Sequence, residues 1–196
     1  MRRNCYFVKD TARARSLYIA LVRSIFESCS IIWRPTNQTL TAKIERIQKL
    51  SIKWMLSEEG TSYSPFEVYV QKCREVNLLP MSTRFDLNDL LFLHKVIYNL
   101  KPVDLPYYLT FFEGQSRLRS CHLDNLSLVS SIQPKSNYLT TRSSNPLANT
   151  FFYRTHSKWN NLPLSLREIR CPFHFKASLK VHFWKNLTDD LGISVE

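Results

Sequence analysis

Two adjacent acids near the end of the sequence, Asp189 and Asp190, are the residue types that a two-metal polymerase site uses. Such a site needs a rigid scaffold and a third carboxylate close to the pair. The nearest other acids in the sequence are Glu168 and Glu196. We therefore interpret the pair as the solvated end of a helix rather than as a catalytic centre.

A second group with chemical potential is Cys171-x-x-His174, followed two helical turns later by His182. The spacing suits zinc, but a zinc site takes four ligands, and no second C-x-x-C or H-x-x-x-H completes the set. Cys121-His122 has no acidic neighbour that would orient the imidazole for nucleophilic catalysis. Glycine-rich phosphate loops and a G-x-S-x-G elbow are absent from the sequence. We expect no catalytic residue, no metal and no cofactor.

The clearest chemical pattern is positive charge along a helix predicted over residues 39–56. Its cations step by three or four residues and share one arc, which suits a phosphate backbone; the alternative is an ordinary solvated face. Together with three arginines of the preceding segment, the predicted nucleic-acid-binding residues are Arg13, Arg15, Arg23, Lys43, Arg46, Lys49 and Lys53. The adjoining row is predicted to pack into the core and comprises Leu40, Ile44, Ile47, Ser51 and Trp54.

The charge balance over the chain also indicates a polyanionic partner. The 196 residues carry 27 Lys and Arg against 16 Asp and Glu, a net charge of +11. Residues 1–53 hold eleven cations against three acids, whereas residues 54–113 hold five against eight. A basic segment favours a polyanionic partner, because neutralised phosphates release their counterions; the alternative is a solubilising surface.

Cysteine usage and hydropathy bear on the compartment. Five widely spaced cysteines without a C-x-x-C do not resemble a disulfide framework, so we expect a reducing compartment, the nucleus or the cytoplasm. The first residues lack a signal-peptide pattern, and no apolar run is long enough to cross a bilayer. We therefore expect no membrane partner.

Apolar periodicity and a content of only three glycines predict a mainly α fold, an irregular helical bundle with a long loop segment that is partly β. Helices are expected at residues 11–33, 39–56, 65–75, 82–100, 104–112 and 147–160 and from Pro172 onward, with 82–100 the most buried. The polar loop can hold a strand pair at 126–132 and 138–141. The predicted segments are basic helices at 1–56, continuing bundle at 57–113, polar linker at 114–149 and an aromatic-rich helical part at 150–196.

Four short blocks then carry a resemblance. They read LYIALVRS through WRP at residues 17–35, IERIQK at 44–49, LPMSTRFD with LLFLHK at 79–95, and TFFYRT, WNNLP, LR and FKASLKVHFW between 150 and 184. In this order they resemble the region that follows the polymerase palm in LINE-type (non-LTR) retrotransposon reverse transcriptases of the jockey and chicken-repeat kind. The endonuclease and the palm with its Tyr/Phe-x-Asp-Asp site have no counterpart in the sequence.

The resemblance implies a thumb and C-terminal fragment that is not an enzyme on its own. Such a fragment would bind the backbone of RNA or of an RNA–DNA hybrid, beside the palm domain of the same polypeptide in the parent family. It would also expose an apolar patch that the catalytic body covers. Two other interpretations stay open: a domesticated helical module that binds a protein and no nucleic acid, and an unrelated enzyme whose site is assembled from scattered His and Cys.

Overall fold

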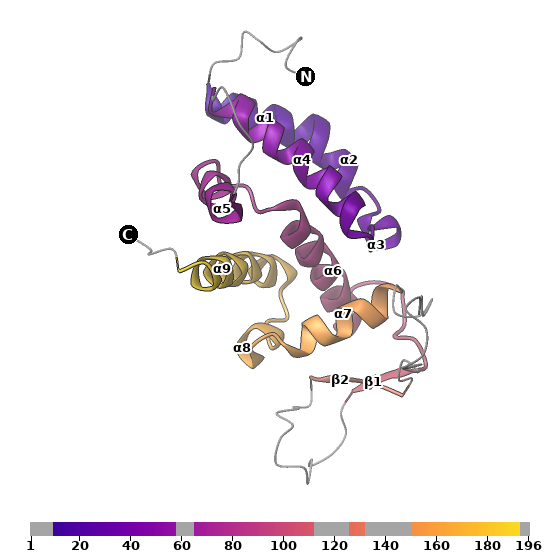
Figure 1. Cartoon of the computed structure of the whole chain (residues 1–196). Coiled ribbons are helices and arrows are strands. Elements are labelled where there is room, and N and C mark those ends of the chain that lie inside the picture. The colour runs from indigo at the N-terminus through magenta and orange to yellow at the C-terminus, as the bar shows by residue number, and fades with distance from the viewer. Residues whose placement is uncertain (1–9, 58–64, 112–125, 132–149, 193–196) are drawn as a thin grey trace, which may run out of the picture. The chain divides into compact units, whose positions relative to one another are not determined.

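The computed structural model of the chain describes residues 10–57, 65–111, 126–131 and 150–192. This part of the chain is mainly helical, which confirms the predicted fold class (Figure 1). Its contacts divide it into two compact units, residues 1–86 with 182–196 and residues 87–181. Both divisions fall inside helices, α6 (Met81–Ile97) and α9 (Pro172–Asp190), and not between the four segments suggested by composition.

In the first unit, the predicted helix over 11–33 forms with one break. Asp10 caps its start by accepting a hydrogen bond from the Ala12 N–H at 3.2 Å. Cys29 interrupts it with a positive φ of 52°. The resulting elements are α1 (Thr11–Tyr18), a π-helical segment η1 (Ile19–Arg23), α2 (Ser24–Glu27) and α3 (Ser30–Trp33).

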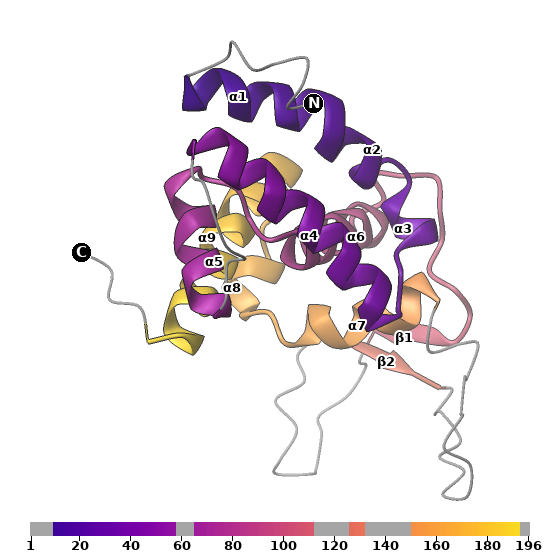
Figure 2. The same ribbon diagram turned by 45° about the horizontal axis from the view of Figure 1, so that its top comes forward.

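The next two helices match their predicted ranges closely. α4 (Gln38–Met55) starts at Asn37, whose side chain accepts from the Thr39 N–H at 2.8 Å. α5 (Phe66–Glu75) starts after Pro65, which occupies the capping position itself. Figures 1 and 2 show α1 and α4 side by side, and the Thr11 hydroxyl donates to the Met55 carbonyl. The core between these helices comprises Ala14, Tyr18, Ile52, Met55, Tyr69, Cys73, Val76 and Leu78.

The side of α4 that faces this core is rotated from the predicted one, although Trp54 of the predicted row packs against the core. Its buried residues are Gln48, Ile52 and Met55. In the predicted packing row, Leu40 is 49% exposed and Ile47 is 40% exposed; the other three members of that row, Ile44, Ser51 and Trp54, are half-buried. The prediction counted apolar side chains only, whereas the orientation of α4 is set by two polar ones, Glu45 and Gln48.

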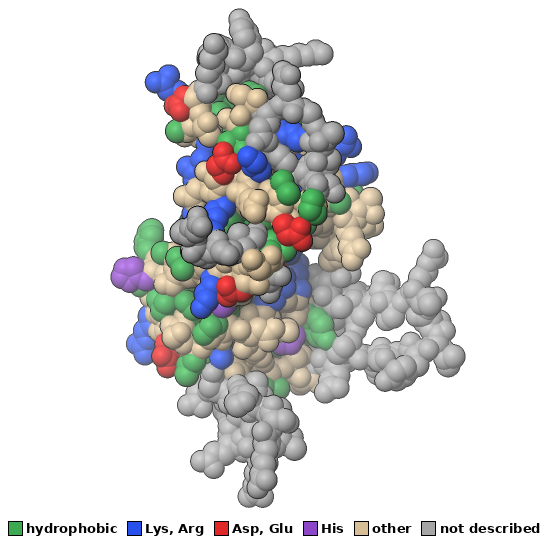
Figure 3. Space-filling view, turned by 60° about the vertical axis from the view of Figure 1, so that its left-hand side comes forward, with side chains coloured by type: hydrophobic (Ala, Val, Ile, Leu, Met, Phe, Trp, Pro, Cys, Tyr) green, Lys and Arg blue, Asp and Glu red, His purple; other side chains and the backbone are tan. Residues whose placement is uncertain are grey.

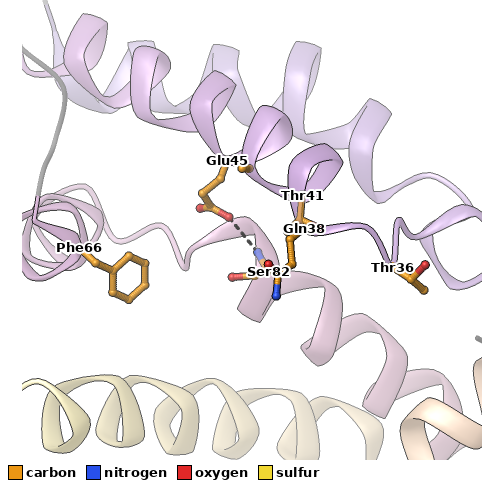
Figure 4. A pocket seen from close by; sticks show the side chains of 7 residues that line it. Thr36, Gln38, Thr41, Glu45, Phe66 and Ser82 are labelled. Atoms are coloured by element: carbon orange, nitrogen blue, oxygen red, sulfur yellow. Dashed lines mark hydrogen bonds between the residues drawn. The ribbon is translucent and has the colours of Figure 1, made fainter. Parts of the chain in front are cut away.

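Glu45 joins three helices. One carboxylate oxygen accepts from the Met81 N–H at 3.0 Å and the other from the Ser82 N–H at 3.2 Å, at the start of α6. The Tyr69 hydroxyl of α5 also donates to this carboxylate. Figure 4 shows the Glu45 side chain directed at Ser82. A carboxylate at a helix N-terminus satisfies otherwise unpaired N–H groups and interacts favourably with the helix dipole.

Gln48 lies one turn further along α4 and is fully buried. Its amide oxygen accepts from the Tyr18 hydroxyl of α1 at 3.0 Å, and its amide nitrogen donates to the Leu79 carbonyl at 2.9 Å. Because a buried amide without partners is costly, these bonds keep Gln48 on the inner side of the helix. We call Glu45 and Gln48 the polar pair of α4.

Asparagine takes the place of glycine at two helix ends. Asn77 and Asn99 follow α5 and α6 with φ of 52° and 54°. In each case the next residue donates a backbone hydrogen bond to the helix. The Leu78 N–H donates to the Cys73 carbonyl at 2.8 Å, and the Leu100 N–H donates to the Lys95 carbonyl at 2.7 Å. This is the Schellman arrangement, in which Asn tolerates the left-handed conformation better than other non-glycine residues. It ends both helices in a chain that has few glycines.

The second unit combines helices with a small sheet. Its elements are the later part of α6, β1 (Leu109–Phe111), β2 (Leu128–Ser130), α7 (Phe151–Asn160), α8 (Leu164–Arg167) and the first part of α9. The strands are antiparallel, with Thr110 opposite Val129. The helix predicted at 104–112 is therefore wrong, because Leu109, Thr110 and Phe111 form a strand there. The strand predicted at 126–132 is confirmed, but it pairs with β1; residues 138–141 lie outside the described residues.

Polar side chains of α7 fasten this unit together. Arg154 forms two hydrogen bonds to the buried Asp89 of α6, at 3.0 and 3.2 Å. The side chain of Asn160 pairs with both backbone groups of Leu128, at 2.9 and 2.8 Å, as a neighbouring strand would. The Trp159 indole donates to the Leu126 carbonyl at 2.8 Å and its ring is fully buried. The aromatic-rich segment is thus part of the core.

His94 of α6 lies within an aromatic cluster in this unit. Its ring stacks on Phe175 with centroids 4.2 Å apart and an interplanar angle of 14°. Nε2 lies 2.6 Å from the Ile169 carbonyl and therefore donates to it, while Nδ1 is buried with no hydrogen-bond partner among the described residues. Burial lowers the pKa of His94 from its ordinary value, with the Ile169 contact acting against this.

Replacing Glu45 tests the junction of α4, α5 and α6. Glu45→Gln keeps the shape but removes the charge and points an amide NH₂ at groups that themselves donate. We expect the free energy of unfolding in urea to fall by about 2 kcal/mol. Glu75→Gln, which removes one partner of an exposed pair with Lys72, should change it by less than about 0.5 kcal/mol. Equal effects would contradict the assigned role of Glu45.

The histidine cluster predicts a dependence of stability on pH. Since the folded-state pKa of His94 lies below its unfolded value of about 6.5, the unfolded chain binds the proton more readily. The contribution of His94 to stability is therefore fully present above its unfolded-state pKa. It is lost as the pH falls toward the folded-state pKa. His94→Gln should flatten this decline in urea titrations at stepped pH, whereas His174→Gln, an exposed side chain, should leave it unchanged.

Candidate nucleic-acid interface

All seven predicted phosphate-binding residues belong to the first unit, and three of them are exposed. Lys43 and Arg46 lie one turn apart on the outer side of α4. Arg13 lies on α1, where its side chain is 83% exposed and 3.5 Å from Asp10. These three side chains can reach a ligand without rearrangement of the fold.

Arg15 and Arg23 are half-buried and engaged within the unit. Arg15 donates to the Asn77 carbonyl at the end of α5, at 3.3 Å. Arg23 forms an ion pair with Glu27 at 3.3 Å, and Glu27 also accepts two hydrogen bonds from Arg84 of α6. Burial lowers the pKa of Arg23, and Glu27 opposes that shift. Arg15 therefore fastens α1 to the end of α5, and Arg23 pairs with the carboxylate that links α2 to α6.

Lys49 and Lys53 lie on the flank of α4 and are half-buried. The Lys49 ammonium is 4.8 Å from the ring centroid of Tyr69, a cation–π contact with α5. The predicted arc of four cations on α4 therefore has an exposed edge, Lys43 and Arg46, and a flank that packs beside α5. On the face drawn in Figure 3, Lys and Arg side chains lie among acidic and hydrophobic ones.

The sequence prediction missed an apolar row beside the exposed cations. Leu40, Ile47 and Leu50 of α4 are 49%, 40% and 57% exposed. On η1 and α2, Leu21 and Ile25 are 55% and 68% exposed. The polar pair was the signal in the sequence for this orientation, since Glu45, Gln48, Ile52 and Met55 share another side of the helix, roughly a third of a turn from the apolar row.

The other chemical candidates are dispersed. Asp189 lies exposed near the end of α9, and Cys171 and His174 are exposed at its start. Among the described residues, no three His, Cys, Asp or Glu side chains come together as potential metal ligands. Burial raises the pKa of the Cys73 thiol to about 12, so it stays protonated at neutral pH. Cys121 and His122 lie outside the described residues.

An open pocket of about 320 Å³ lies at the start of α4, α5 and α6 (Figure 4). Its lining is Thr36, Gln38, Thr41, Ala42, Glu45, Phe66 and Ser82. Both carboxylate oxygens of Glu45 already accept hydrogen bonds, so the pocket offers a mainly apolar wall and no uncommitted charge among these residues. No described helix combines the length and the apolar character needed to cross a bilayer.

A comparison of Arg23 and Arg13 tests which of these cations stabilises the folded state. Arg23→Gln should lower the free energy of unfolding by about 1 kcal/mol, because it breaks a half-buried ion pair. Arg13→Gln, at an 83% exposed site, should stay within about 0.5 kcal/mol of the parent protein. Chemical denaturation of both variants at low and high salt is the measurement. A larger loss for Arg13→Gln would reverse the assignment.

Comparison of the chain with protein-family models, with curated proteins and with solved structures finds no match. The likeness to retrotransposon reverse transcriptases therefore stays a prediction that rests on the four sequence blocks.

Proposed function

We propose that this chain is a non-catalytic nucleic-acid-binding fragment that holds the phosphate backbone of RNA or of an RNA–DNA hybrid. The observation that carries the proposal is the exposed pair Lys43 and Arg46 on α4, within a segment of strong positive charge. Contacts of this kind position a protein on a duplex without reading its bases. The proposal assigns no reaction to the chain and places it in a reducing compartment, the nucleus or the cytoplasm.

Three observations support this proposal. The acids of residues 10–57 are Asp10, Glu27 and Glu45, and each is already engaged by neighbouring groups of the chain. The outer face of α4 therefore keeps its positive potential, and Lys49 and Lys53 extend it along the flank of the helix. The resemblance to the region after a polymerase palm, where the palm of the same polypeptide would be the partner, adds the expected kind of ligand.

Salt dependence of hybrid binding tests the proposal. A fluorescein-labelled RNA–DNA hybrid is titrated with the full chain at several salt concentrations, and the slope of log affinity against log salt is measured. Lys43→Gln/Arg46→Gln should weaken binding to all hybrid sequences alike and reduce the slope by about 2, one for each lost phosphate contact.

The matched control is Lys101→Gln/Arg170→Gln, which removes the same charge from two exposed sites of the second unit. This variant should retain most of the slope. If both double variants lose affinity equally, binding follows net charge and the α4 site is wrong. Hybrid binding without any salt slope would overturn the proposal, and nucleotide incorporation by the purified chain would overturn its non-catalytic part.

A further inference from the structure

The first unit leaves two apolar rows uncovered. On α4 the row consists of Leu40, Ile47 and Leu50, and on η1 and α2 it consists of Leu21 and Ile25. Large apolar side chains are ordinarily exposed singly, whereas adjacent rows mark an interaction surface. We call these five residues the apolar face.

The two rows belong to adjacent helical runs. Tyr18 of α1 bonds to Gln48 of α4, and Figures 1 and 2 show α1 and α4 side by side. Contacts with α5 and α6 use other sides of these helices, through Arg15, Glu27, Glu45 and Lys49. The apolar face therefore lies on sides that the packing of the unit leaves open.

The length of the face suits a helix. Residues 40 to 50 span about 15 Å along α4, roughly three turns, which matches the anchors at i, i+3, i+4 and i+7 of an amphipathic helix.

The charge around the face selects the partner. Lys43 lies within the α4 row and Arg46 lies at its edge, both exposed. The three described acids of residues 10–57 are committed to Arg13, to Arg23 and Arg84, and to the start of α6. An occupant with acidic flanks would meet these cations, whereas one with basic flanks would be repelled.

We propose that the apolar face of α2 and α4 docks an amphipathic helix with acidic flanks, supplied by a partner protein. Its apolar side chains lie between the two rows, and its carboxylates pair with Lys43 and Arg46. This surface is separate from the flank of α4 that carries Lys49 and Lys53. The inference does not depend on nucleic-acid binding.

The test uses the full chain and two labelled synthetic helical peptides of about 20 residues. Both carry Leu at i, i+3, i+4 and i+7 of each repeat; one has Glu at the flanking positions and the other has Lys. By fluorescence anisotropy at low salt, the Glu peptide should bind at least tenfold more tightly than the Lys peptide. The ratio should shrink as salt is raised.

Substitutions separate the apolar and the charged contributions. Leu40→Gln/Ile47→Gln should weaken binding of the Glu peptide at least tenfold, while circular dichroism shows an unchanged fold because both side chains are already exposed. Lys43→Gln/Arg46→Gln should remove most of the preference for Glu over Lys. Phe173→Gln/Val181→Gln, at 82% and 68% exposed sites of the second unit, is the matched control and should change affinity less than twofold.

Several results would overturn the inference. Equal binding of the two peptides, or an equal loss in the Phe173/Val181 control, would mean non-specific apolar adhesion. The face would instead be a membrane-binding surface if the chain bound phosphatidylserine vesicles but neither peptide, and if Leu40→Gln/Ile47→Gln abolished the vesicle binding. A dimer in sedimentation that the same variant dissociates would make a second copy the occupant. Hybrid affinity measured on Leu40→Gln/Ile47→Gln should stay unchanged, which keeps this test distinct from that of nucleic-acid binding.

Discussion

The arrangement of the first unit depends on the carboxylate of Glu45 at the start of α6. A buried or half-buried charge needs hydrogen-bond donors, and two backbone N–H groups and the Tyr69 hydroxyl provide them. Gln48, one turn further along, has the same need and meets it with Tyr18 and Leu79. Together they determine which side of α4 faces inward. The apolar row with Leu40 and Ile47 lies about a quarter turn or more from that side, so it is left outward together with Lys43 and Arg46.

The sequence blocks behind the family resemblance contribute residues that hold the fold. In the first unit Arg34 pairs with Asp86, Trp33 packs edge-on against Phe85, and the polar pair of α4 belongs to IERIQK. In the second unit Arg154 pairs with Asp89, and Asn160 pairs with strand β2. These contacts give Arg154 and Asn160 a structural role, because each side chain satisfies polar groups within its own unit. The residues of these blocks therefore have a role in the packing of this chain.

Much of the helical architecture could be predicted from periodicity and capping, because both are local. Helix α4 begins at its Asn37 cap, and α9 begins at Pro172. The orientation of α4 could not be predicted by counting apolar residues, since it is decided by donors that come from α1, α5 and α6. The strand at Leu109–Phe111 was missed for a similar reason: its partner lies 17 or more residues away, and pairing overrides the local preference. For the candidate site, residue type identified all seven cations, but only the contacts distinguish Lys43 and Arg46 from Arg15 and Arg23, which are used within the unit.

The two proposed surfaces share a boundary on one helix, and this has a physical consequence. At 100° per residue, Lys43 lies within the apolar row, and Arg46 lies between that row and the flank that carries Lys49 and Lys53. A phosphate backbone along the flank and an acidic helix on the apolar face would each draw on these same two side chains. Each cation can neutralise only one anion at short range, so occupation of one surface weakens the charge available to the other. The coupling is reciprocal, so binding at either surface weakens binding at the other. It arises because Glu45 and Gln48 turn the apolar row outward and bring it beside the cations.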